Sequence, residues 1–348
     1  MNVDFETNVN LKTRWEALKA ENPGLRIRNA AQELGVTEME LLATQIGETA
    51  TPLKADFESL LKRFEEIGYA MSLTRNASIV HERKGVFSNF SWSPYAALFV
   101  GEDIDIRFFP TVWKYAFTVV EGNDEKPRKS IQIFDKYGDA VYKLYIENKS
   151  NVEAFEQIIV DFEDTPNFKI ELENAPELAK VRPIENIDVN REAFQEEWIN
   201  LKDTHDFFGM VKRHNLHRIE ALNLAPTAHY ASKVDNGSLR KALNLASESG
   251  QEIMVFVGNR GAIGIHTGPV KKIVDYGPWL NVLDPEFNLH IFEADIKESW
   301  VVRKPTEDGE VTSLECFDAN GELIITLFGK RKPGIPELES WRKLVEQL

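Results

Sequence analysis

The sequence is poor in cysteine and contains no long apolar run. Cys316 is the single cysteine among 348 residues, which excludes an internal disulfide framework and suits a reducing compartment. It occupies an alternating apolar position in SLECFDANG, which predicts a buried strand residue and not a nucleophile. No stretch approaches the ~18 uninterrupted apolar residues of a membrane helix. The first residues, MNVDFETNVNLK, have neither the basic start nor the apolar core of a secretory signal. We therefore expect a cytoplasmic protein without stable membrane insertion.

Positive charge is also scarce. There are 41 lysines and arginines against 56 aspartates and glutamates, a formal net charge of −15. Nucleic acids and anionic membranes attract proteins that carry a positive field, so neither is expected as a partner. A small anionic ligand remains possible, but only where arginines and lysines gather locally.

The most informative positive feature is an internal repeat. The segment SIQIFDKYGDAVYKLY (130–145) matches SLECFDANGELIITLF (313–328), a displacement of 183 residues. The same displacement aligns other residues along the chain: Trp15 with Trp198, Met71 with Met254, Asn76 with Asn259, and Val119 with Val302. The sequence thus predicts two copies of one fold, at residues 1–162 and 191–348. The connector 163–190 has three prolines and an acidic bias, with at most a short strand at FKIEL (168–172).

Each copy repeats the same order of elements. Helical periodicity comes first, at 10–22, 25–35 and 37–47 in one copy and at 191–202, 205–215 and 217–225 in the other. Short alternating strands follow, with hairpin turns at Tyr137-Gly138 and Asn320-Gly321, and a helix is expected at 336–348. Helices grouped before consecutive antiparallel strands predict an α+β fold.

Polar positions that differ between the copies are the better functional candidates, because shared residues mostly maintain the fold. Under the 183-residue displacement, His205 lies opposite Asn22, and Arg107 lies opposite His290. Asp203 or Thr204 is a natural N-cap, so His205 is expected at a helix N-terminus, where the helix dipole favours the neutral, metal-binding imidazole. From the residues alone, a capping or surface histidine is an equally open interpretation. His214 and His217 are three residues apart and could chelate a metal, but no carboxylate or cysteine at ligand spacing supports them.

Arg107 belongs to the predicted strand IDIRFF. Alternation places Asp105, Arg107 and Phe109 on one face and apolar residues on the other. An arginine beside an aromatic ring suits a pocket for a flat, apolar, anionic ligand. A cross-strand salt bridge on a solvated face is the alternative.

Several long strings together resemble the HemS-type family of cytoplasmic haem-utilisation proteins, also called hemin-degrading factors. They are LKTRWEALKAENPGLRIRNAAQELGV, LKDTHDFF, GAIGIHTGPV, WLNVLDPEFNLHIF and VRKPTEDGEVTSLECFDANG. The resemblance covers nearly the full length and includes the duplication. It implies stacked antiparallel sheets in a saddle-like core, flanked by the first helices of each repeat, with haem (iron protoporphyrin IX) as the bound ligand.

The resemblance also assigns roles to particular residues. His205 matches the family's proximal iron ligand in the D-x-H-x-F stretch, Arg107 its distal and catalytic arginine, and Phe109 the adjacent aromatic contact. Basic residues that match those facing the haem propionates are Arg218, Lys304 and Arg331, while His81 could contact a second haem. An arginine stays protonated and cannot ligate iron, but it can donate hydrogen bonds and stabilise negative charge.

Two functions follow, and the resemblance does not separate them. In the first, the protein binds haem through His205 and opens it oxidatively to release iron. In the second, it is a non-enzymatic carrier that accepts haem from an importer and delivers it to a haem oxygenase or stores it. A scaffold whose histidines bind zinc or nothing is a third, less specific reading.

Overall fold

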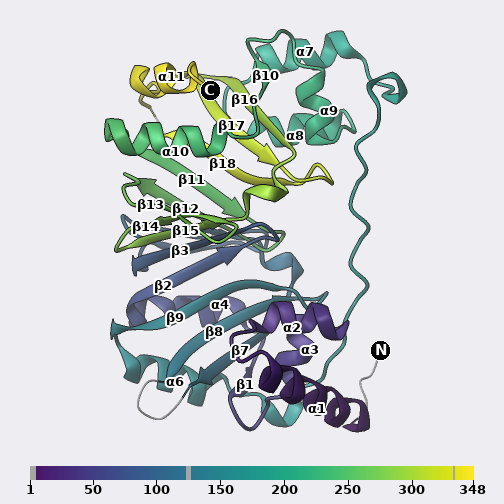
Figure 1. The fold of residues 1–348 in the computed structure, drawn as a ribbon, viewed down its shortest axis with the longest axis vertical. Helices are drawn as coiled ribbons and strands as arrows, with labels where there is room; N and C mark the ends of the chain where they lie inside the picture. The colour runs from purple at the N-terminus through teal and green to yellow at the C-terminus, as the bar shows by residue number, and fades with distance from the viewer. Residues whose placement is uncertain (1–4, 123–126, 332–333) are drawn as a thin grey trace. The chain divides into compact units, whose positions relative to one another are not determined.

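The computed structural model describes residues 5–122, 127–331 and 334–348 (Figure 1). The chain forms two units. Unit 1 contains the chain up to Arg75, together with Glu82–Pro176 and Asn259–Gly264. Unit 2 contains Asn76–His81, Glu177–Gly258 and Ile265–Leu348. Each unit therefore includes a short segment from the other half of the sequence, and strands β3 (Ile79–Val86) and β12 (Ala262–Gly268) are divided between the units.

Unit 1 begins with three helices, α1 (Phe5–Glu21), α2 (Ile27–Leu34) and α3 (Glu38–Ala43). One antiparallel sheet follows in the order β1-β7-β8-β9-β2-β3, and a second group has the order β4-β5-β6-β12. The strand bounds are β1 Ala50–Leu53, β2 Gly68–Arg75, β4 Phe90–Trp92, β5 Ala97–Val100, β6 Asp105–Phe108, β7 Trp113–Glu121, β8 Arg128–Asp135 and β9 Ala140–Ser150. The remaining α-helices are α4 (Phe57–Lys62), α5 (Phe64–Ile67) and α6 (Val152–Phe162).

Unit 2 also begins with three helices, α7 (Arg191–Ile199), α8 (Asp206–Arg213) and α9 (Arg218–Asn223). Its strands have the orders β10-β16-β17-β18-β11-β12 and β13-β14-β15-β3. The strand bounds are β10 Ala231–Val234, β11 Ile253–Gly258, β13 Ile273–Tyr276, β14 Trp279–Leu283, β15 Phe287–Ile291, β16 Glu298–Thr306, β17 Gly309–Phe317 and β18 Leu323–Gly329. The remaining α-helices are α10 (Ser238–Ser249) and α11 (Glu339–Val345).

The two strand orders are the same once each strand is replaced by its counterpart in the other unit. The registers agree as well, because Ala50 lies opposite Val119 in unit 1 and Ala231 lies opposite Val302 in unit 2. The predicted α+β class and the tandem duplication are therefore confirmed, with the first helices of each repeat placed before its sheet.

The shared asparagines Asn76 and Asn259 explain part of the repeat. Each side chain accepts hydrogen bonds from two backbone N–H groups in the turn that follows it and donates to two backbone carbonyls. The donors and acceptors are Ser78, Ile79, Gly258 and Ile324 for Asn76, and Gly261, Ala262, Arg75 and Val141 for Asn259. These residues are identical in both copies because the same backbone groups need satisfying at both places.

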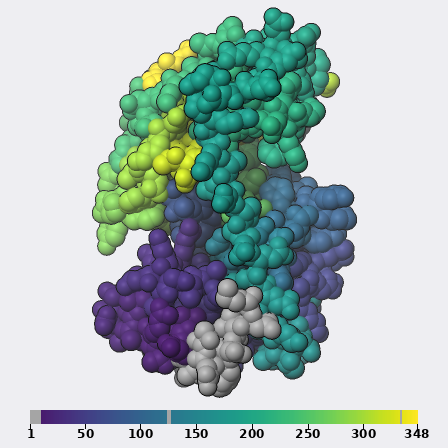
Figure 2. Space-filling model, turned by 90° about the vertical axis from the view of Figure 1, so that its right-hand side faces the viewer, coloured from purple at the N-terminus to yellow at the C-terminus, as the bar shows by residue number. Residues whose placement is uncertain are grey.

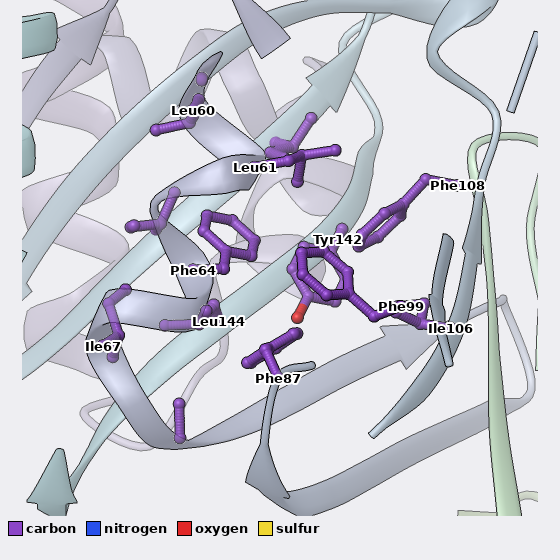
Figure 3. Packing of buried hydrophobic residues seen from close by; sticks show 14 of the residues in the cluster. Leu60, Leu61, Phe64, Ile67, Phe87, Phe99, Ile106, Phe108, Tyr142 and Leu144 are labelled. Carbon is purple, nitrogen blue, oxygen red and sulfur yellow. The ribbon is translucent and has the colours of Figure 1, made fainter. Parts of the chain in front are cut away.

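A cluster of aromatic rings anchors β6 in the core of unit 1 (Figure 3). Phe108 packs edge-on against Tyr142, with ring centroids 4.8 Å apart, and Phe64 and Phe99 continue the cluster. Ile104, Ile106 and Phe108 are all buried, as the alternating pattern predicted. The intervening residues of β6 consequently point away from this core.

The connector differs from the prediction at FKIEL, which forms no strand. Phe168, Ile170 and Leu172 pack beside the buried cluster of β7, but Tyr115 takes the place of a strand partner. Its hydroxyl accepts a hydrogen bond from the backbone N–H of Glu171 and donates to the carbonyl of the same residue, both at 2.7 Å. Much of the rest of the connector is exposed, as the teal segment in Figure 2 shows.

Three helical segments were not predicted: α4 with α5, α6, and α10. Their apolar residues are few and close to strands, so they were not distinguished from the alternating segments around them. Cys316 lies on β17 and is fully buried, as predicted. Burial raises the pKa of its thiol to about 12, which leaves it without nucleophilic character near neutral pH.

Candidate functional site

His205 is the residue at which α8 begins. Its backbone has helical angles, φ −69° and ψ −27°, and its side chain makes no capping hydrogen bond to α8. The predicted position at a helix N-terminus is therefore correct, although the N-cap is His205 itself and not Asp203 or Thr204. The side chain is 93% exposed, so the ring is open to a ligand from solution.

Asp203 fixes the orientation of the His205 ring. Its Oδ1 accepts a hydrogen bond from the backbone N–H of His205 at 2.8 Å and lies 2.6 Å from ring atom Nδ1. These interactions, beginning with the backbone one, lower the pKa of the Asp203 carboxyl. A carboxylate can only accept, so Nδ1 carries the proton and Nε2 retains its lone pair. Carboxylates orient metal-binding histidines in this way in many proteins.

Two further residues share the exposed side of α8 with His205. Phe208 is three residues further on and 70% exposed, and Gly209 is four residues further on. A Cβ atom at Gly209 would lie 3.1 Å from an Arg213 nitrogen, so the glycine keeps this face low. Sequence reasoning missed Phe208 because either phenylalanine of HDFF could be the buried one. The structure buries Phe207 and leaves Phe208 as an apolar surface beside the imidazole.

Beneath α8, Arg218 and Lys304 share one buried carboxylate. Arg218 donates from Nε and Nη2 to the two oxygens of Glu315, and Lys304 donates to Oε1, each at 2.7 Å. Both cations also lie over the ring of Phe207, at 5.1 and 4.8 Å from its centroid. Two cations and one carboxylate leave a surplus of one positive charge close to the helix that carries His205.

Burial and charge act against each other in this cluster. Burial would raise the pKa of Glu315, but Arg218 and Lys304 hold it well below its ordinary value. Burial lowers the pKa of Lys304 to about 8 despite its bond to Glu315, and Arg218 adds to this effect. Lys304 is only 3% exposed, so it reaches a ligand through its charge more readily than by contact, while Arg218 is partly accessible.

Arg331 lies close enough to Asp203 for its charge to contribute to the lowered pKa of that carboxyl. Unit 2 therefore brings together four residues selected from the sequence: His205, Arg218, Lys304 and Arg331.

Arg107 and Phe109 belong to unit 1. Arg107 is partly exposed on β6 and pairs with Asp105 two residues earlier on the same strand, not with a neighbouring strand. Burial raises the pKa of Asp105, although Arg107 opposes this. Phe109 is half-buried just after β6, where its backbone N–H donates to the carbonyl of Gly261 at 2.9 Å. The alternation that placed Asp105, Arg107 and Phe109 on one face holds.

The other histidines considered have structural partners. His214 ends α8 and hydrogen-bonds to Glu197 through Nε2 at 2.8 Å, while His217 caps α9 in a capping box with Glu220. His81 is buried edge-on to Phe287, with ring centroids 5.1 Å apart. No group of three or more His, Cys, Asp and Glu side chains within the described segments could hold a metal ion, so a three-histidine centre is absent there.

The fold and site define a duplicated α+β protein that presents an oriented, solvent-facing imidazole above a buried cationic cluster. The sequence model of the haemin-degrading HemS.ChuX domain matches twice, at residues 35–162 and 215–348. The chain therefore belongs to the HemS family, which confirms the resemblance found in the sequence.

Known relatives cover almost the whole chain. The hemin transport protein HemS of Yersinia enterocolitica is 39% identical over 95% of this chain and 94% of its own. The hemin transport protein HmuS of Yersinia pestis is 37% identical over 98% of each chain. Holo-PhuS, a heme-binding protein from Pseudomonas aeruginosa, has 42% identity and a TM-score of 0.94, covering 98% of this chain and 99% of its own. ChuS, described as an E. coli heme oxygenase, has 36% identity and a TM-score of 0.87, covering 97% and 99%.

Among the described residues, no helix has both the length and the apolar character needed to cross a membrane.

Proposed function

We propose that this protein binds haem and that Nε2 of His205 is the ligand of its iron. The observation that carries the proposal is the pairing of His205 with Asp203, which leaves Nε2 as the open nitrogen on a 93% exposed side chain. Haem recognition by the HemS, HmuS and PhuS relatives supports it.

The residues around His205 suit a haem, which is a flat apolar disc with two carboxylates at its edge. Phe208 offers an apolar contact, Gly209 leaves space beside the imidazole, and Arg218 and Arg331 are partly accessible cations. Lys304 adds positive charge from below. Apolar contact would contribute roughly 25 cal/mol per Å² buried, and guanidinium pairing would orient the propionates.

Binding is tested by titrating the purified protein with hemin and following the Soret band. His205→Ala should change the ligand-field spectrum and weaken binding by at least about tenfold, equivalent to 1.4 kcal/mol. His214→Ala and His217→Ala are the matched controls, because both rings already have partners, and both should leave the spectrum unchanged. An unaltered spectrum in His205→Ala would refute the ligand assignment.

We further propose that the bound haem is opened oxidatively, with haem as both substrate and source of the chemistry: reduced haem iron activates dioxygen. Arg107 would stabilise the negative charge that develops as dioxygen is reduced. Its guanidinium has five N–H donors, and both Asp105 and the Ile106 carbonyl engage Nη1. Asp105 thereby holds the group in place, and Phe109 is a proposed apolar contact. The relative ChuS, described as a heme oxygenase, supports this activity.

The activity is tested with an electron donor, air and catalase. Loss of the Soret band with release of chelatable iron and an iron-free tetrapyrrole is expected, and Arg107→Gln should slow the loss at least about tenfold while haem still binds. If catalase abolishes the loss, the reaction depends on free peroxide and the enzymatic proposal fails. Under that outcome the protein is a carrier, as the names of the Yersinia relatives favour, and haem should pass intact to apomyoglobin.

In either role, we propose a cytoplasmic location and transient partners, namely a haem importer or a haem oxygenase. The single, buried and unpaired Cys316 is compatible with a reducing compartment.

A further inference from the structure

Helix α2 of unit 1 is the counterpart of α8, and the residue at its start corresponds to His205. Both helices contain eight residues, and the helices that follow them, α3 and α9, each begin with a capping box, at Thr37 and His217. Alignment by these helix starts places Arg26 opposite His205, four residues from the Asn22 that the uniform displacement gave. In unit 1, an arginine thus replaces the proposed iron ligand.

Arg26 is not the only cation there. Arg28 lies in the first turn of the same helix, which has no acidic residue in that turn and no side-chain capping bond. Helix N-termini carry a partial positive charge, so arginines at this end are disfavoured unless something negative accompanies them.

Arg75, at the end of β2, adds a third guanidinium. Burial and the charges of Arg28 and Arg26 lower the pKa of Arg75 to about 10, although Glu38 opposes them. A shift in this direction shows that positive charge outweighs negative charge around the group.

The one carboxylate that acts on Arg75 is already shared. Glu38 forms a buried ion pair with Lys143, and Arg28 and Arg75 also act on it. The groups that act on one another here are therefore four cations, Arg26, Arg28, Arg75 and Lys143, and a single carboxylate. In a protein with a net charge of −15, this surplus of three positive charges is a local exception.

We propose that Arg26, Arg28 and Arg75 form a binding site in unit 1 for a small, multiply charged oxyanion of the phosphate type. Guanidinium groups match phosphate oxygens in bidentate pairs, and the N–H groups of the first turn of α2 supply further donors. A doubly charged anion would relieve the repulsion among the three arginines. A nucleic acid would not fit, because the overall negative charge repels an extended polyanion.

The site can be tested with pyrophosphate by calorimetry and thermal unfolding. Pyrophosphate should bind the wild-type protein and raise its Tm, whereas sodium chloride at equal ionic strength should not. Arg28→Gln combined with Arg75→Gln should weaken pyrophosphate binding at least tenfold. Arg26→Gln, which changes an exposed side chain, should weaken it severalfold and guards against misfolding of the double variant.

The matched control is Arg191→Gln, which removes an exposed arginine at the start of α7, where Asn190 caps the helix and no arginine cluster occurs. It should bind pyrophosphate like the wild type. An equal stabilisation by chloride, or unchanged pyrophosphate affinity in Arg26→Gln and the double variant, would overturn the proposal. Without an anion, the double variant should have a Tm equal to or above that of the wild type, because repulsion is removed.

Discussion

At the residue scale, the properties of His205 depend on one neighbour. An exposed histidine with no oriented partner can exchange its proton between both nitrogens and rotate freely. Asp203 removes both freedoms by engaging the backbone and the ring of the same residue. The position thus combines accessibility with a prepared lone pair, which is the arrangement expected for a metal ligand.

Removing Asp203 should therefore weaken haem binding without removing the ligand. We expect Asp203→Ala to lower the haem affinity by about tenfold or more, with a smaller loss for Asp203→Asn, whose amide oxygen can still accept from Nδ1. Soret titration measures both. Asp206→Ala removes an equally close carboxylate in the first turn of α8 and serves as the control. Equal losses in Asp203→Ala and Asp206→Ala would show that only net charge matters.

The sequence was sufficient to select His205, since its counterpart in the other copy is a different residue. It could not show that Arg218 and Lys304 share Glu315, because the pairing joins residues 97 and 11 positions apart through the fold. Phe208 was missed for a local reason: adjacent phenylalanines are equivalent until the helix phase is known.

At the element scale, α9 is held by a carboxylate that serves three partners. Glu220 closes the capping box with His217 and accepts hydrogen bonds from the backbone and side chain of Arg182 in the connector. Burial would raise the pKa of Glu220, but the bonds from Arg182 and the backbone lower it to about 2. The side chain is 1% exposed, so this charge is well shielded from solvent.

The lowered pKa predicts a pH dependence of stability. The ionised Glu220 stabilises the folded state above its ordinary pKa of 4.5, and this contribution is lost as the pH falls toward 2. It amounts to at most about 3 kcal/mol. We expect the unfolding free energy of Glu220→Gln to be lower near neutral pH and to decline less between pH 5 and 2. Denaturant titrations at several pH values measure this.

Glu196→Gln, which changes an exposed residue of α7, should follow the wild-type pH profile. If Glu220→Gln shows the full wild-type decline, the carboxylate is not the group that links α9 to the connector.

The elements also show where periodicity fails. The first helices of each repeat and the long strands were predicted, since their patterns extend over several turns or residue pairs. The short α4 and α5, and the helices α6 and α10, were not. The displacement of 183 residues is constant for the strands, but the helix starts require about four residues less, so α2 and α8 align correctly only in the structure.

At the scale of the whole molecule, duplication assigns conserved contacts to the fold and divergent residues to ligands. Asn76 and Asn259 illustrate the first kind, and the contrast between His205 and Arg26 illustrates the second. We retain 1–162 and 191–348 as the proposed repeats and 163–190 as the connector, although the units of the structure exchange the short segments Asn76–His81 and Asn259–Gly264.

The two asparagines should be equally important for stability. Asn76→Ala and Asn259→Ala each leave two backbone N–H groups and two carbonyls without their side-chain partner, so each should cost on the order of 2–4 kcal/mol of unfolding free energy. Denaturant unfolding measures the loss. Asn236→Ala, which removes one exposed bond to the carbonyl of Lys297, should cost much less. A loss in only one of the two variants would mean that the repeat is not symmetric in its energetics.

The central claim is that Nε2 of His205 binds haem iron, and pulsed electron paramagnetic resonance tests it most directly. The ferric haem complex is prepared from protein labelled with ¹⁵N only in histidine. We predict a strong ¹⁵N hyperfine coupling from an axial imidazole in the wild type, His214→Ala and His217→Ala, and its loss in His205→Ala. A coupling that persists in His205→Ala would contradict the account.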